Sequence, residues 1–194
     1  MPSKLHQIPR TGALSPEYAL LGLLAQSPAH GYELYQRLST DLDQVWHLSM
    51  SQVYNILNRL EAQGYIAGVV QEQDKLPARR LFHLTPSGKR RYEDWLNAPS
   101  GSSVRSIRLE FLTRLYFARL DSLERAHQVI ETQVAETQKG MERLRALRDD
   151  IPGDQLINRL SLELRLRQLE SILLWLQTCH IAIETTPDLP IVEG

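Results

Sequence analysis

The most constraining feature of this sequence is the segment 49–64, which has the start, the periodicity and the end of a short helix. Ser49 and Gln52 form a capping box, in which each side chain bonds the backbone N–H of the other residue. Gly64 readily adopts a left-handed conformation and therefore predicts where the helix stops. Between these limits, apolar residues follow at helical spacing: Val53, Ile56, Leu57 and Leu60. One face of the helix must therefore be buried.

The opposite face of this helix is small and polar, which suits close approach to another molecule. With a turn of about 100° per residue, it carries Ser51, Asn55 and Asn58. Tyr54 flanks this face on one side, and Gln52 and Arg59 flank it on the other. Asn and Gln amides can make paired hydrogen bonds with adenine in a major groove. Taken alone, the same face is more typical of an ordinary solvated helix surface. The neighbouring elements must therefore decide between a solvated surface and a DNA-binding one.

The elements around this helix follow the order of a winged helix-turn-helix. Two short helices precede it, the first beginning at Ser15-Pro16 and the second spanning about 31–38. Two β-like segments, 65–70 and 80–84, follow it, and Thr85-Pro86 begins a fourth helix. The sequence therefore predicts a mainly α protein with a winged helix-turn-helix domain and a two-stranded wing.

Charge supports a nucleic-acid partner only locally. The chain has 22 basic and 23 acidic residues, so its net charge of -1 gives no general case for nucleic acid or a membrane surface. From Lys75 to Arg91, however, there are six basic residues and no acidic one. Lys75, Arg79 and Arg80 belong to the wing, where they are expected to contact phosphates. We therefore predict that double-stranded DNA is the partner.

Several stretches resemble the PadR family of bacterial transcriptional regulators. They are the segments 19–24, 30–34, 51–64, 80–88 and 110–118. The resemblance implies a dimeric DNA-binding regulator, usually a repressor, that often loses DNA affinity when a small molecule binds. It also places Ser51, Gln52 and Tyr54 among the DNA-reading positions. The full predicted DNA-contacting set is Ser49, Ser51, Gln52, Tyr54, Asn55, Asn58, Arg59, Lys75, Arg79 and Arg80.

The C-terminal half is expected to be an all-helical dimerisation domain. Segment 156–183 has 16 apolar residues out of 28, and they do not keep to one stripe. A helix that is apolar over so much of its circumference must be buried on more than one side. A homodimer is therefore predicted. The alternative is a monomeric bundle in which the winged domain covers the second side of this helix. The expected seam consists of Leu162, Leu166, Leu169, Leu173 and Leu176.

The expected organisation has five parts. A flexible tail at 1–14 precedes the winged domain at 15–98, a linker at 99–103, the helical domain at 104–184 and a second tail at 185–194. Lys4 and Arg10 before a short apolar run could also mimic a signal peptide. That run is far too short to span a membrane, and the single Cys179 allows no internal disulfide. These features favour a cytoplasmic protein with no membrane association.

The sequence offers no catalytic, metal or nucleotide site. No nucleophile elbow, zinc motif, P-loop or dinucleotide fingerprint occurs, so neither an enzyme nor a cofactor is expected. Trp95 has two interpretations, a core side chain or a platform on which a flat effector of unknown identity stacks. A winged-helix module that binds a protein instead of DNA is the alternative function.

Overall fold

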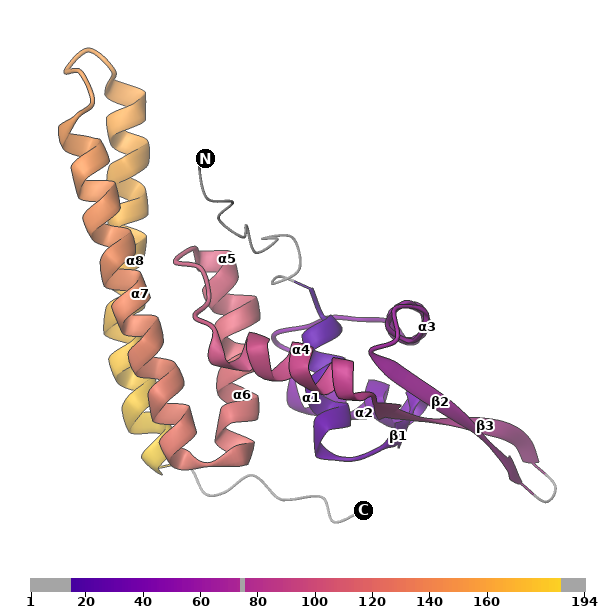
Figure 1. Ribbon diagram of the computed structural model, residues 1–194. Helices are drawn as coiled ribbons and strands as arrows, with labels where there is room; N and C mark the ends of the chain where they lie inside the picture. Colours follow the sequence, from indigo (N-terminus) through magenta and orange to yellow (C-terminus); the bar gives the residue numbers. More distant parts are fainter. Residues whose placement is uncertain (1–14, 74–75, 186–194) are drawn as a thin grey trace, which may run out of the picture.

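The computed structural model describes residues 15–73 and 76–185. Its first part is compact, and its second part is dominated by a long helical hairpin that stands beside it (Figure 1). The elements of the first part are α1 (Glu17–Gln26), β1 (Ala29–His30), α2 (Gly31–Asp41), α3 (Met50–Ala62), β2 (Ile66–Gln73), β3 (Leu76–Leu84) and α4 (Pro86–Asn97). Those of the second are α5 (Val104–Ser106), the π-helical turn η1 (Ile107–Phe111), α6 (Leu112–Asp121), α7 (Leu123–Asp149) and α8 (Leu156–Thr185).

The predicted helix after Ser49 is confirmed in its start, its packing and its end. The Ser49 hydroxyl accepts a bond from the Gln52 N–H, and the Gln52 side chain accepts one from the Ser49 N–H. Its apolar face is buried in a core shared with α1, α2 and α4. Gly64 has a φ of 73°, the left-handed value that favours glycine.

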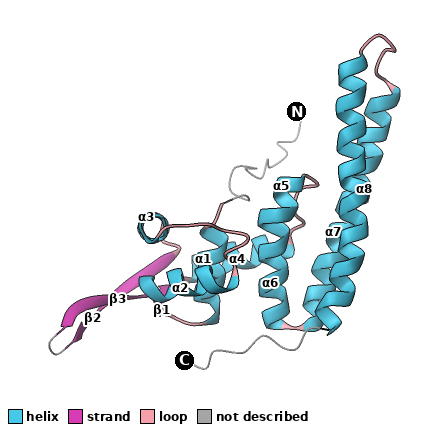
Figure 2. Ribbon diagram, turned by 180° about the vertical axis from the view of Figure 1, so that it is seen from behind, coloured by secondary structure: helices cyan, strands magenta, loops and turns pink. Residues whose placement is uncertain are grey.

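The wing is longer than predicted and belongs to a three-stranded sheet. Strands β2 and β3 form an antiparallel ribbon, and β1 pairs with the other edge of β3 through Ala29 and Phe82. Figure 2 shows this ribbon reaching away from the helical hairpin. The mainly α winged-helix prediction is therefore confirmed, with one additional short strand.

Residues 104–121 join the two parts of the molecule. Leu109 and Phe117 lie in the core of the winged part, whereas Phe111, Leu115 and Ala118 lie in the core formed with α7 and α8. Polar contacts support the first of these interfaces. The Trp46 indole N–H donates to the Thr113 hydroxyl over 2.8 Å, in a buried position. Segment α5–α6 is thus packed on both sides.

The predicted linker at 99–103 is anchored to α7 through Ser100 and Ser102. Ser100 is buried, and its backbone N–H and carbonyl both bond the side-chain amide of Gln133 on α7. Gly140 on α7 has no side chain, so Ser102 can lie close to the backbone of that helix. Within residues 15–73 and 76–185, no helix has the length and hydropathy needed to cross a bilayer.

Candidate nucleic-acid interface

The polar face of α3 is solvent-exposed, as the sequence predicts. Ser51, Gln52, Asn55 and Asn58 are all exposed, and Tyr54 is 39% exposed. The buried back of the helix and the capping box at Ser49 fix the direction in which these side chains point. A helix presented in this way can enter a major groove with its amide side chains toward the base edges.

Met50 is also exposed, at the edge of this face beside Tyr54, and was missed by the sequence analysis. It is the first residue of α3 and is 42% exposed. Its thioether side chain can contact the methyl group of thymine, the apolar feature of the major groove. Nothing in the sequence signals its exposure, because Met50 has the helical spacing of the buried stripe with Val53 and Leu57.

Tyr54 lies against the start of α2, in space that the absence of a side chain at Gly31 leaves open. A Cβ atom on Gly31 would lie 2.7 Å from Tyr54 Cε1, which is closer than carbon atoms can approach. A crevice of about 380 Å3 opens beside this contact, lined in part by Tyr32, Asn58 and Arg79. Helix α3, the start of α2 and the wing therefore form one continuous surface around this crevice.

Arg59, predicted to contact DNA, is bound to an acidic partner within the chain. Its guanidinium lies 2.6 Å from one carboxylate oxygen of Glu17 on α1, and Arg91 lies 2.8 Å from the other oxygen. The Glu17 side chain is nearly buried, whereas that of Arg59 remains about half exposed. Arg59 thus links α3 to α1, and Glu17 partly neutralises the charge that was predicted to contact DNA.

Arg80, at the base of the wing, is also paired with an acidic side chain of the chain itself. It forms an ion pair with Glu61 over 2.5 Å, and the same carboxylate oxygen accepts the Gly68 N–H. Arg79, one residue earlier, is exposed and has no acidic partner among the residues that the structure describes. Lys75 lies outside the described residues. Arg79 is therefore the described wing residue best suited to a phosphate.

Replacing Arg79 with Ala should lower the dependence of DNA affinity on salt. One lost phosphate contact should reduce the slope of log affinity against log salt by about 1. Arg80→Ala is the matched control, and we expect a smaller change because Glu61 already neutralises that charge. Titrations of a labelled duplex at several salt concentrations measure both slopes. Equal slopes in Arg79→Ala and the unmodified protein would remove Arg79 from the interface.

Behind this surface, a buried polar network connects the winged part to the hairpin. Arg114 on α6 donates to the Trp95 carbonyl, the Ser100 hydroxyl and the Glu110 carboxylate. Arg114 and Glu110 are both almost fully buried. Burial raises the pKa of the Glu110 carboxyl, which the adjacent Arg114 counteracts, and burial also lowers the pKa of the Arg114 guanidinium.

Trp95 lies in this core and not on an open surface. Its ring stacks on Tyr18, with centroids 4.7 Å apart and planes 8° from parallel, and the Arg114 guanidinium lies over it. Only 6% of the side chain is exposed. Of its two interpretations, the structure favours the core side chain, because no exposed ring face remains for an effector.

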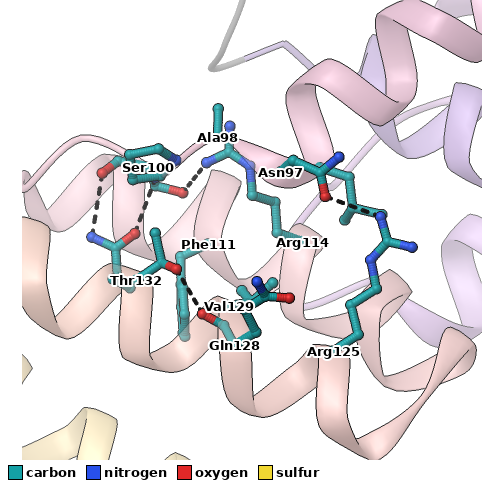
Figure 3. A pocket seen from close by; sticks show the side chains of 12 residues that line it. Asn97, Ala98, Ser100, Phe111, Arg114, Arg125, Gln128, Val129 and Thr132 are labelled. Atoms are coloured by element: carbon teal, nitrogen blue, oxygen red, sulfur yellow. Dashed lines mark hydrogen bonds between the residues drawn. The ribbon is translucent and has the colours of Figure 1, made fainter.

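A pocket of about 170 Å3 adjoins the network (Figure 3). It lies where the end of α4, α6 and α7 meet, and its walls combine Phe111 and Val129 with polar side chains. Arg125 forms part of this wall and bonds both Asp121 and Asn97. A small molecule held here would touch both parts of the chain.

Comparison with known proteins agrees with this architecture. Residues 20–94 match the family model described as the transcriptional regulator PadR-like family, and residues 107–184 match one described as virulence activator alpha C-term. The negative transcriptional regulator PadR of Bacillus subtilis (strain 168) is 30% identical over 124 residues. The match covers 63% of this chain and 66% of that relative.

The chain belongs to the PadR-like family. This is a family of transcriptional regulators and not of enzymes, in agreement with the sequence analysis. The two matched segments cover the winged part and the helical part in the same order as the structure.

Solved structures of PadR-like proteins are also similar to the chain. The crystal structure of B. subtilis PadR with operator DNA shares 24% identity and a TM-score of 0.42, and covers 86% of this chain and 98% of its own. That of the same PadR with p-coumaric acid shares 25% identity and a TM-score of 0.38, with coverage of 87% and 98%.

Proposed function

We propose that this PadR-like protein is a transcriptional repressor that binds a pseudo-palindromic operator as a homodimer. The observation that carries the proposal is the exposed polar face of α3, which a capping box and a buried back hold rigidly beside the wing. Each subunit inserts α3 into a major groove, while Arg79 contacts the phosphate backbone. Repression is supported by the B. subtilis relative, which is named a negative regulator.

Asn55→Ala should weaken binding to the specific site by about 1–3 kcal/mol, because Asn55 lies at the centre of the exposed face and can pair with a base. Affinity for random DNA should hardly change. The site is obtained by selecting tight binders from randomised duplexes, and affinities follow from fluorescence anisotropy.

Gln138→Ala is the matched control, since Gln138 is an exposed amide on α7, far from the wing. It should change neither affinity. If no sequence is enriched in the selection, the DNA-binding proposal is wrong and a protein-binding winged helix becomes the better explanation. If Asn55→Ala weakens specific and random DNA equally, Asn55 does not read a base.

The homodimer is assigned to a different face of α8 from the one that the sequence predicted. Most of the expected seam is buried against α7 within one subunit, namely Leu162, Leu166, Leu169 and Leu176, with Leu173 partly buried. These leucines therefore stabilise the hairpin and are not available to a second copy. The outward face of α8 remains apolar and exposed, through Leu156, Ile157, Leu160, Leu164, Leu174 and Ile181.

A groove extends this outward face toward α5. It encloses about 540 Å3 between α8 and the segment 104–112, and its walls are mainly apolar, including Val104, Ile107 and Trp175. A large exposed apolar patch is typical of a protein interface. We assign the outward face of α8 and this groove together to the second copy.

Release by a small molecule is assigned to the pocket in Figure 3. A ligand wedged there would move α7 relative to α4 and so change the separation of the two recognition helices. B. subtilis PadR, a relative, has been solved with p-coumaric acid, so small aromatic carboxylates are the first compounds to screen for release of DNA.

Thr132→Trp should fill this pocket and abolish release by any compound that acts through it. Thr132 lines the pocket from α7 and is only partly buried, so the larger ring can enter the cavity. Release that persists in the Thr132→Trp variant would place the effector elsewhere.

A further inference from the structure

A second and larger cleft lies on the helical part, away from both the DNA-facing surface and the pocket of Figure 3. It encloses about 670 Å3 between the segment 101–105, α7 and α8. This volume is within the range of small-molecule sites, about 300–1,000 Å3. The α7–α8 hairpin and the start of α5 stand side by side at this place (Figure 1).

The lining of the cleft is strongly basic. Among the described residues, it includes three arginines, Arg105, Arg143 and Arg165, and no Asp or Glu. The arginines come from α5, α7 and α8 respectively. Three guanidinium groups from three separate elements thus surround one cavity.

Two of these guanidinium groups are not neutralised within the described part of the chain. Arg105 and Arg165 have no carboxylate within 4.0 Å there, whereas Arg143 lies 3.0 Å from Glu136. Two arginines of the hairpin that do not line the cleft are paired with acids, Arg145 with Glu170 and Arg167 with Glu163. The cleft therefore gathers positive charge that the protein itself leaves unbalanced.

The floor of the cleft is apolar. Leu144 and Leu169 are buried beneath it, and Leu147 lies at its edge, about half exposed. Gly140 forms part of the floor, where a Cβ atom would lie 2.6 Å from the Ser102 hydroxyl. The cleft thus combines basic walls with an apolar base, which matches a ligand that has an anionic group and a short hydrocarbon part.

We propose that this cleft binds an organic anion, a carboxylate or phosphate ester with a short apolar chain. Arg105 and Arg165 bind the anionic group, and Leu144, Leu147 and Leu169 receive the chain. Arg165 and Leu169 lie toward α7, whereas Leu160 and Leu164 face the opposite way, so these two leucines lie outside the cleft. The cleft adjoins the groove assigned to the second copy, with which it shares Val104 and Gln168. The proposal is independent of DNA binding.

The test is calorimetric titration of the full chain with octyl phosphate, octanoate and octanol, all below aggregating concentrations. Both anions should bind, the phosphate more tightly, and the alcohol should bind at least about tenfold more weakly because it makes no charge-assisted bonds. The double variant Arg105→Gln with Arg165→Gln should bind octyl phosphate about tenfold or more weakly than the unmodified protein.

The control is Arg145→Gln with Arg148→Gln, which removes two charges of the hairpin whose guanidinium groups already have acidic partners. It should bind octyl phosphate like the unmodified protein, and circular dichroism should show that both double variants remain folded. Absence of binding by either anion, equal affinity for the alcohol, or equal losses in the two double variants would overturn the proposal. DNA affinity of the same variants is measured separately and does not enter this test.

Discussion

Arg114→Ala should lower the free energy of unfolding by about 3–5 kcal/mol, because it leaves a buried carboxylate without its partner. Glu110 lies 2.6 Å from the Arg114 guanidinium, and both side chains are almost fully buried. The same substitution removes donors to the Trp95 carbonyl and to Ser100. Urea unfolding followed by circular dichroism gives the change.

Replacing both charged partners separates this effect from simple loss of packing. Arg114→Met combined with Glu110→Leu should recover most of the lost stability, since no unpaired charge remains in the core. A loss below about 1 kcal/mol in Arg114→Ala would mean that water reaches Glu110 and that the junction is not the closed core described above.

Leu160→Glu combined with Leu164→Glu should convert the proposed dimer to a folded monomer. Both leucines are exposed in the single chain, at 53% and 59%, so the fold itself should tolerate the change. In a dimer they become buried, and burying unpaired carboxylates costs several kcal/mol, which raises the dimer dissociation constant by about 100-fold or more. Sedimentation velocity across a concentration series measures this constant.

Ala135→Glu with Gln138→Glu adds the same two charges to exposed positions of α7 and serves as the control. It should leave the dimer intact. Leu169→Ala provides a second comparison, because Leu169 is buried against α7 and its truncation should destabilise the fold by about 2–5 kcal/mol. If the α8 double variant remains dimeric, the outward face of α8 is not the interface.

The recognition helix was predictable because its determinants are local. Ser49 and Gln52 are three residues apart, Gly64 closes the same segment, and the apolar stripe lies between them. The third strand could not be predicted, since Ala29 and His30 form a strand only by pairing with β3, about fifty residues later. A strand of two residues is too short to show the alternation of apolar and polar side chains by which strands are predicted.

The acidic partners of the arginines could not be predicted from the sequence either, because they lie far away along the chain. Arg59 contacts Glu17, 42 residues away, and Arg80 contacts Glu61, 19 residues away. Charge counting identified the basic wing but could not separate Arg79, which is unpaired among the described residues, from Arg80. The docking of Ser100 on Gln133 was hidden in the same way, because a Ser- and Pro-containing segment has the composition of a linker.

The seam of α8 shows a limit of a different kind. The helix is apolar on two opposite faces, and the structure shows one of them covered by α7 and the other exposed. Nothing in that pattern says which face meets α7. Only the packing of the hairpin assigns Leu162, Leu166 and Leu169 to the subunit core and leaves Leu160 and Leu164 exposed.

The number of chains bound to one operator tests the central claim most directly. A selected duplex containing both half-sites is titrated with the full chain at nanomolar concentration, and the mass of the complex is measured by sedimentation equilibrium. We expect two chains per duplex, with half-site centres about 34–36 Å apart, so that the two α3 helices enter successive major grooves on one side of the DNA. A tight complex containing a single chain would contradict the claim.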